Sequence, residues 1–155
     1  MRKNIGLLID DLNTEYTSAA VKGAELGARA IDANMYIFPG MYLDNTQSFD
    51  RHLQYEYQYN TLFQFANDNH LDILYIMMGM IGCRINLEAR RKFLAQFLGI
   101  PVVILYTDMP GYPSIIFDNQ GAFMHGIRHL IVDHGAKKIG FVSGPKTNID
   151  AMERL

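Results

Sequence analysis

Short apolar runs alternate along this chain with longer segments of helical periodicity, and this alternation restricts the fold more than any other feature. The runs NIGLLI at 4–9, DILYIM at 72–77 and VVIL at 102–105 are nearly unbroken in apolar residues. A strand that is covered on both faces has this pattern, whereas a strand with one solvated face alternates between apolar and polar residues. We therefore expect an α/β fold, with a parallel sheet and helices on both of its faces.

The expected elements follow from the two periodicities and from the Gly and Pro residues that separate them. Strands are expected at 4–9, 35–38, 72–77, 102–105, 114–117 and 138–142. Helices are expected at 14–31, 48–69, 87–98 and 119–134, with a further short helix after Pro145. Asn13 or Thr14 can cap the first of these helices.

Composition narrows the class of protein. The chain has 155 residues, a net charge of −2 and 49% hydrophobic residues, which suits one domain with a substantial core and gives no bulk attraction to nucleic acid. No stretch approaches the roughly 20 apolar residues of a membrane span, and the apolar run at the N-terminus is too short for a signal peptide. A single cysteine, Cys83, fits a reducing compartment. We expect a cytoplasmic protein with no membrane partner.

The sequence contains little that predicts catalysis. Asp10 and Asp11 are neighbours at the end of a strand, so their side chains point in opposite directions. His125 and His129 share a helix face, but Gly126 stands where a zinc-protease motif has Glu, so we expect ordinary, partly buried histidines. Cys83 has no evident base partner and no phosphate-binding loop is present. We expect no enzyme activity, no metal site and no cofactor.

Candidate ligand residues lie where the expected strands end. Open parallel sheets bind ligands beyond the carboxyl ends of their strands. This rule selects the following candidates: Asp11, Asn13, Tyr16, Tyr106 and Asp118. Asp118 also precedes an expected helix, so its side chain can be a helix cap instead.

The expected second helix has two apolar faces. At α-helical spacing, the residues that share the sheet-facing side are Tyr55, Tyr59, Leu62, Phe63, Ala66 and His70. Leu53 and Tyr57 point nearly the opposite way. They are either scattered surface residues or part of a homodimer interface, where aromatic residues are enriched.

Residues 113–145, PSIIFDNQGAFMHGIRHLIVDHGAKKIGFVSGP, resemble the lobe-crossing segment of the LacI/GalR-type regulators and their periplasmic sugar-binding relatives. The matching motifs are Asp118-Asn119, His129-Leu130-Ile131, His134-Gly135 and Gly144-Pro145. The resemblance implies a periplasmic-binding-protein-like I domain, in which two lobes clamp a small molecule such as a sugar, a purine or a small acid. It makes residues 1–118 the N-terminal lobe, and 119–155 the crossover and the incomplete beginning of the C-terminal lobe.

The resemblance also implies roles for single residues. Arg154 matches a position where family members place an arginine that contacts the effector, although a residue on an ordinary helix surface is the alternative. Asn13 and Tyr16 match first-helix residues that face the cleft. LacI/GalR repressors begin with a helix-turn-helix head, and this chain opens directly on the first strand.

Three functions remain open at this point. The segments LLIDDLNTEY and GPKTNIDAMER most resemble sensor domains of bacterial signalling proteins, in which lobe closure is passed to an output domain such as a GGDEF diguanylate cyclase or a kinase. The alternative is the effector-binding core of a LacI/GalR transcriptional repressor, which reaches DNA only through a helix-turn-helix that is not in this chain. A small, complete α/β enzyme is the third reading and lacks a nucleophile–base pair.

Overall fold

The structure is a computed structural model that describes residues 2–44, 53–67, 70–144, 152 and 154. It divides into two compact units, Met1–Ile115 and Ile116–Leu155. The elements in chain order are β1 (Asn4–Ile9), α1 (Glu15–Ala30), β2 (Asn34–Pro39), the 3₁₀ helix η1 (Leu53–Ala66), β3 (Ile73–Ile76), α2 (Met78–Ile81), α3 (Leu87–Leu94), the 3₁₀ turn η2 (Ala95–Phe97), β4 (Val102–Leu105), β5 (Ser114–Ile115) and α4 (Asn119–Val132). All but α4 belong to the first unit.

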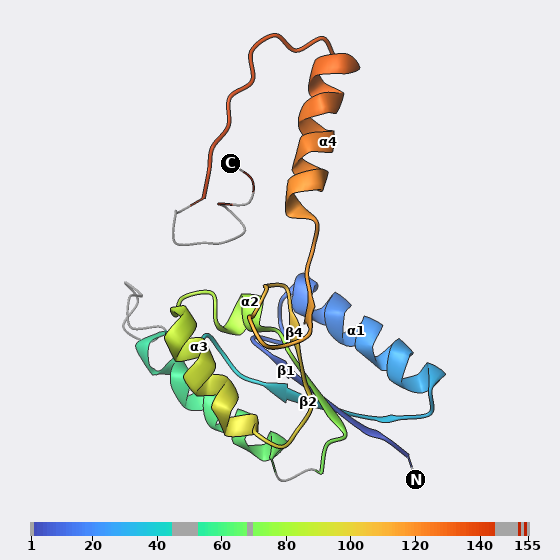
Figure 1. The fold of residues 1–155 in the computed structure, drawn as a ribbon, viewed down its shortest axis with the longest axis vertical. Coiled ribbons are helices and arrows are strands. Elements are labelled where there is room, and N and C mark those ends of the chain that lie inside the picture. Colours follow the sequence, from blue (N-terminus) through green and yellow to red (C-terminus); the bar gives the residue numbers. More distant parts are fainter. Residues whose placement is uncertain (1, 45–52, 68–69, 145–151, 153, 155) are drawn as a thin grey trace. The chain divides into compact units, whose positions relative to one another are not determined.

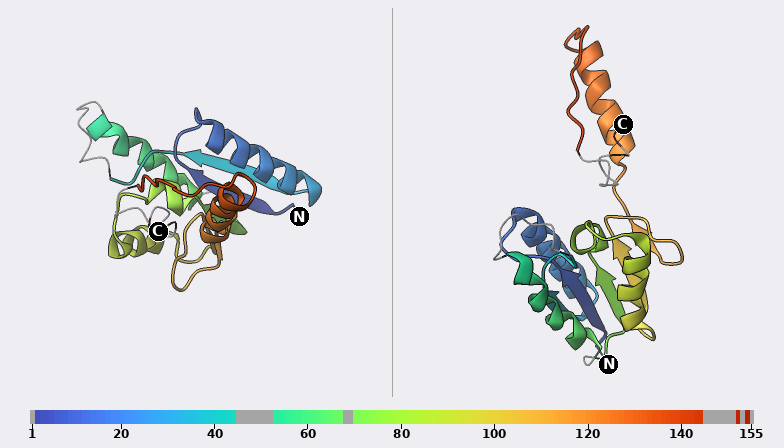
Figure 2. Two further views of the ribbon diagram at one scale, coloured as in Figure 1. Left: turned by 90° about the horizontal axis from the view of Figure 1, so that it is seen from above. Right: turned by 90° about the vertical axis from the view of Figure 1, so that its left-hand side faces the viewer.

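The five strands form one parallel sheet in the order β2-β1-β3-β4-β5. Helices cover both of its faces, with α1 on one side and η1 and α3 on the other (Figure 1 and the right-hand view of Figure 2). Successive residues of β1 point to opposite faces: Leu8 packs in the cluster that includes η1 and α3, whereas Leu7 and Ile9 pack beneath α1. The expected α/β class with a doubly covered parallel sheet is confirmed.

Helix starts follow the capping residues of the sequence. The Thr14 side chain accepts a hydrogen bond from the backbone N of Thr17 at 3.1 Å, which selects Thr14 over Asn13 as the cap of α1. Asn86 caps α3 through the backbone N of Ala89 at 2.9 Å. Short polar side chains of this kind satisfy backbone N–H groups that have no partner within the helix. The local sequence was therefore a good guide to where helices begin.

The buried face of η1 differs from the expected one. Tyr55 and Tyr59 were expected to pack on the sheet, but they are 63% and 58% exposed. A 3₁₀ helix has three residues per turn, so a spacing of three defines its buried face, and this face contains Asn60, Phe63 and Ala66. The prediction assumed the spacing of an α-helix and therefore placed both tyrosines on the wrong face of the helix. His70 follows the helix and is also exposed.

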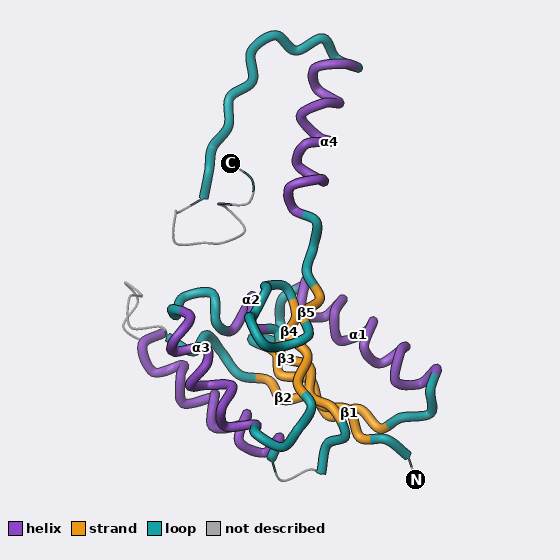
Figure 3. The backbone as a smooth tube through the Cα atoms, viewed as in Figure 1, coloured by secondary structure: helices purple, strands orange, loops and turns teal. Residues whose placement is uncertain are grey.

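The strand expected at 138–142 is absent, and the chain runs there as a loop (teal in Figure 3). A strand is stabilised by hydrogen bonds to a neighbouring strand, and no strand lies in the described part of the second unit. Phe141 and Val142 accordingly remain exposed. The short helix expected after Pro145 falls almost entirely outside the described residues.

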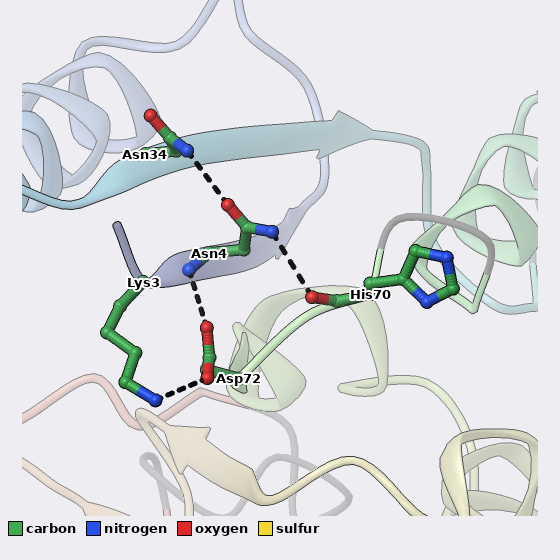
Figure 4. Close-up of polar contacts among 5 residues, drawn as sticks. All are labelled: Lys3, Asn4, Asn34, His70 and Asp72. Atoms are coloured by element: carbon green, nitrogen blue, oxygen red, sulfur yellow. Dashed lines mark hydrogen bonds and ion pairs between the residues drawn. The ribbon is translucent and has the colours of Figure 1, made fainter. Parts of the chain in front are cut away.

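Polar contacts tie together the amino ends of the first three strands (Figure 4). The Asp72 carboxylate accepts hydrogen bonds from Lys3 Nζ at 2.7 Å and from the backbone N of Asn4 at 2.8 Å. Asn4 also donates to the backbone O of His70 at 3.3 Å and accepts from Asn34 Nδ2 at 2.9 Å. The hydrogen bond from Lys3, followed by that from Asn4, lowers the pKa of Asp72.

Candidate functional site

The carboxyl ends of β1 to β4 lie along one edge of the sheet because the strands are parallel; we call this the carboxyl edge. Asp10, the first residue after β1, is 3% exposed and accepts a hydrogen bond from Thr17 Oγ1 at 2.8 Å. The Thr17 hydroxyl in turn accepts one from Thr14 Oγ1 at 2.9 Å. Asp10 therefore links the end of β1 to the first turn of α1, and its buried carboxylate is occupied by this structural contact.

Asp11 and Asn13 form a polar turn between β1 and α1. The Asp11 carboxylate accepts from both the backbone N and the Nδ2 of Asn13, at 2.9 and 2.7 Å. A carboxylate that bonds the backbone two residues later closes a turn of the type that Asp favours. The structure thus brings together two of the candidate ligand residues, and both of their side chains lie at the surface of the carboxyl edge.

Tyr16 and Tyr106 meet at the same edge, although 90 residues separate them in the chain. Their ring centroids lie 5.4 Å apart with an interplanar angle of 61°, an edge-to-face contact. Tyr16, in the first turn of α1, is 44% exposed, and Tyr106 directly follows β4. Strand-end position selected both residues, the family resemblance also selected Tyr16, and the fold makes them neighbours.

The backbone at Tyr106 is held in an unusual conformation. Its φ of +69° lies in the left-handed region that side chains other than glycine rarely adopt. Gly79 in α2 packs directly against it, because a Cβ at Gly79 would lie only 2.5 Å from the backbone O of Tyr106. Strained residues of this kind often occur at ligand-binding sites, where the surrounding packing maintains them. Here a glycine in the turn after β3 permits the close approach.

Sequence reasoning missed a second group of side chains near the carboxyl edge, which includes two arginines. The Arg84 guanidinium lies 4.0 Å from the centre of the Tyr42 ring, a cation–π contact. Arg90 is only 7% exposed, and it donates from Nε to the backbone O of Gly82 at 3.1 Å and from Nη1 to Thr107 Oγ1 at 3.4 Å. Arg90 thereby ties α3 to the turns that follow β3 and β4.

A sequence signal for Arg90 did exist. Arg90 lies three, four and seven residues before Phe93, Leu94 and Phe97, all of which are buried, so helical spacing places it on the apolar face of α3. Burial lowers the pKa of Arg90, because the charged guanidinium is desolvated. An arginine on the apolar face of a helix that follows the carboxyl end of a strand was therefore a detectable candidate.

The surroundings of Cys83 and Tyr42 both favour the neutral form of the side chain. Burial raises the pKa of the Cys83 thiol, and the neighbouring Arg84 and Arg90 only partly oppose this shift. Burial, followed by the nearby Cys83, also raises the pKa of Tyr42. Because the thiolate is the nucleophilic form of cysteine, this environment disfavours reactivity at Cys83.

The second unit contains the other two candidates, Asp118 and Arg154. Asp118 Oδ1 accepts from the backbone N of Gly121 at 2.8 Å, so the predicted cap of α4 is confirmed. Arg154 is exposed and donates from Nη2 to Asn119 Oδ1 at 3.2 Å, while its side chain lines a surface hollow along α4. Their roles in effector binding remain predictions.

The interface prediction and the histidine prediction have different outcomes. Tyr57 is 52% exposed, whereas the side chain of Leu53 lies outside the described residues, so the interface stays a prediction. The expectation that His125 and His129 are partly buried was wrong: both are exposed, whereas the partly buried residues of α4 include Phe123 and Ile127. Among the side chains that the structure describes, no group of three or more His, Cys, Asp or Glu is placed to hold a metal ion. No helix in the described ranges is long and apolar enough to span a membrane.

No protein-family model matches the chain, and no curated protein matches it by sequence. Solved structures do match. The transcriptional repressor AscG of Escherichia coli superposes with a TM-score of 0.67 at 15% identity, over 98% of this chain and 50% of AscG. The lac repressor dimer bound to operator and the anti-inducer ONPF gives a TM-score of 0.71 at 18% identity, over 99% of this chain and 42% of the repressor.

A third match is the Cra transcriptional dual regulator of Pseudomonas putida in complex with fructose 1-phosphate. Its TM-score is 0.64 at 18% identity, over 99% of this chain and 51% of Cra. The fold of this chain is that of the matched parts of these LacI-type regulators. It spans about half the length of the regulators it matches. At these identities the likeness establishes the fold, which confirms the structural part of the resemblance seen in the sequence.

Proposed function

We propose that this chain is part of the effector-binding core of a transcriptional regulator and that it binds a small molecule at the carboxyl edge. The observation that carries the proposal is the convergence of Asp11, Asn13, Tyr16 and Tyr106 at that edge of a LacI/GalR-type sheet. Ligands of open parallel sheets bind at this position. The complexes of the lac repressor with ONPF and of Cra with fructose 1-phosphate support a small-molecule ligand for this fold.

The polar and aromatic groups at this edge suit a hydroxylated ligand. Asp11 presents a carboxylate that can accept hydrogen bonds from hydroxyl groups, and Asn13 offers both a donor and an acceptor. The tyrosine pair provides aromatic surface for the apolar face of a sugar or for a purine ring. For Asp118 and Arg154, which belong to the second unit, an effector-binding role stays a prediction from the family resemblance. The guanidinium fork of Arg154 suits hydroxyl or carboxylate oxygens.

Such a domain performs no chemistry and acts by shifting an equilibrium. A ligand that binds one conformation more tightly than another changes the population of the two, and an attached DNA-binding segment responds to that change. The comparisons favour this reading over the signalling sensor preferred from the sequence, because the matched structures are transcription regulators and none of those described above is a cyclase or a kinase. A homodimer belongs to the same proposal, since the matched lac repressor is a dimer on its operator. The proposal also includes a cytoplasmic location.

The tyrosine pair allows a direct test. Binding of fructose 1-phosphate, ONPF, galactose and adenine to the 155-residue chain is measured by isothermal titration calorimetry, first for the unaltered chain and then for variants. With whichever probe binds, Tyr106→Ala is expected to raise Kd at least about tenfold, which is a loss of about 1.4 kcal/mol. The matched control is Tyr59→Ala, because Tyr59 is an exposed tyrosine on η1. Equal binding by the two variants would show that the carboxyl edge is not the ligand site.

A further inference from the structure

Two histidines meet where α4 ends. His129 lies in the last turn of α4, and the chain then turns back so that His134 Nε2 lies 3.0 Å from His129 Nε2. The turn is defined by Gly135, whose φ is +64°, and by a hydrogen bond from the backbone N of Ala136 to the O of Leu130 at 3.0 Å. Helices commonly end in this way, with glycine in the left-handed conformation. The backbone therefore places two imidazole nitrogens side by side.

The second ring nitrogen of His129, Nδ1, is in contact with a carboxylate. Asp133 Oδ2 lies 2.6 Å from His129 Nδ1, and both side chains are more than half exposed. An Nδ1–H that donates to this carboxylate leaves Nε2 of His129 with a free lone pair, directed away from Asp133. A carboxylate that orients a metal-binding histidine in this way is a recurrent feature of metal sites.

The spacing of the two nitrogens fits a shared metal ion. With metal–nitrogen distances of about 2.05 Å, nitrogens 3.0 Å apart subtend an angle of about 94° at the ion. Two rings that converge in this way have centroids about 4.7 Å apart, whereas rings joined head-on by an N–H···N hydrogen bond would have centroids about 5.3 Å apart. The observed centroid separation is 4.6 Å, with the ring planes at 88°.

We propose that His129 and His134 together bind a divalent transition-metal cation, with water completing the coordination sphere and Asp133 positioning His129. The angle of about 94° is close to the right angle of square-planar and octahedral coordination and below the roughly 109° of tetrahedral zinc, so Ni²⁺ and Cu²⁺ fit better than Zn²⁺. To bind the ion, His134 carries its proton on Nδ1 and offers the Nε2 lone pair. The site consists of two protein ligands and is independent of the effector site proposed above.

Calorimetric titration of the untagged 155-residue chain with NiCl₂ tests this proposal, with ZnCl₂ and MgCl₂ titrated in parallel. We expect one Ni²⁺ per chain, weaker binding of Zn²⁺, and no heat from Mg²⁺, which prefers oxygen ligands. His134→Ala and His129→Ala should each weaken Ni²⁺ binding at least tenfold. Asp133→Asn should weaken it by about 10- to 100-fold while leaving both ligands in place.

The matched control is His125→Ala, which removes a histidine from the same helix one turn earlier. It should leave the affinity for Ni²⁺ unchanged. Circular dichroism of each variant reports whether α4 persists, and Asp133→Asn tests the geometry without removing either imidazole. If the chain binds no Ni²⁺, or if His125→Ala weakens binding as much as His134→Ala does, the histidine pair is only a hydrogen-bonded contact and the proposal is wrong.

Discussion

In the part of the chain that the structure describes, the two longest α-helices, α1 and α4, have similar lengths but very different surroundings. Both are capped by a short polar side chain, Thr14 for α1 and Asp118 for α4. Helix α1 buries Thr17 and Ala28, whereas α4 has no buried residue. Local sequence is enough to define where each helix begins. Among the described residues, the sheet of the first unit supplies the surface against which a helix is buried.

The same contrast extends to the two units as a whole. Every buried apolar side chain among the described residues lies between Leu7 and Met109. In the second unit, apolar residues such as Met124, Ile131 and Val142 are exposed. Isolated helices of about 12–15 residues are marginally stable, because most helix stability in proteins comes from tertiary packing. We therefore expect the first unit to account for most of the cooperative stability of this chain.

A matched pair of isoleucine substitutions should show the largest difference. Ile76 in β3 is fully buried, so Ile76→Ala is expected to lower the free energy of unfolding by about 2–5 kcal/mol. Ile131 in α4 is about half exposed, and Ile131→Ala should change the free energy of unfolding by less than about 0.5 kcal/mol. Urea denaturation followed by circular dichroism measures both. Similar losses would mean that α4 shares the cooperative core and that the contrast is wrong.

Glycine substitutions in the two units should have opposite signs. Gly79→Ala places a methyl group against the backbone of Tyr106, which cannot move aside like a flexible side chain, so we expect a loss of about 1–3 kcal/mol. At Gly126 in α4 a Cβ meets nothing within 4 Å, so Gly126→Ala should increase helix stability by about 0.5–1 kcal/mol. Thermal and urea unfolding decide the signs. A neutral Gly79→Ala variant would argue against the close approach at the carboxyl edge.

Removing the helix caps should reduce the stability of the two helices by about the same amount, but different measurements should detect the loss in each unit. Thr14→Ala and Asp118→Ala each remove a hydrogen bond to the first turn, at a cost of about 1 kcal/mol. For Thr14 the loss should appear in the global unfolding of the first unit. For Asp118 it should appear as faster amide hydrogen exchange confined to α4. If Asp118→Ala lowered the free energy of global unfolding, the two units would have to unfold together, contrary to the contrast drawn above.

The amino end of the sheet provides the smallest expected effect, a dependence on pH. The pKa of Asp72 is lowered in the folded chain, chiefly by the hydrogen bond from Lys3, so its contribution to stability is present above the unfolded-state pKa of about 3.9. That contribution is lost as pH falls through the lower, folded-state pKa. The Asp72→Asn variant should therefore lose less stability than the unaltered chain between about pH 5 and pH 2. Parallel urea titrations across that range measure the difference, and identical acid profiles would contradict it.

Much of the candidate site was predictable, and the missing part has a physical cause. Asp11, Asn13, Tyr16 and Tyr106 follow from strand-end position, because the ends of parallel strands meet at one edge wherever the strands lie in the sheet. The contact between Tyr16 and Tyr106 could not be predicted, since it depends on α1 and β4 lying close together in the fold. The partners of Arg90 also belong to the turns after two different strands, and no local pattern relates them.

The sequence by itself determined the α/β class, the approximate position of the five paired strands and of the longer helices, and the residues from which the caps of α1 and α4 come, with Asn13 left as an alternative to Thr14 and a ligand role left open for Asp118. These features depend on residues close together in the chain, namely apolar runs, helical spacing and single polar side chains. Tertiary structure alone decided the strand order, the orientation of η1 and the fate of residues 138–142. Each of these depends on which distant segments are present to pack or pair with, because a strand needs a neighbour and a helix face needs a surface to cover.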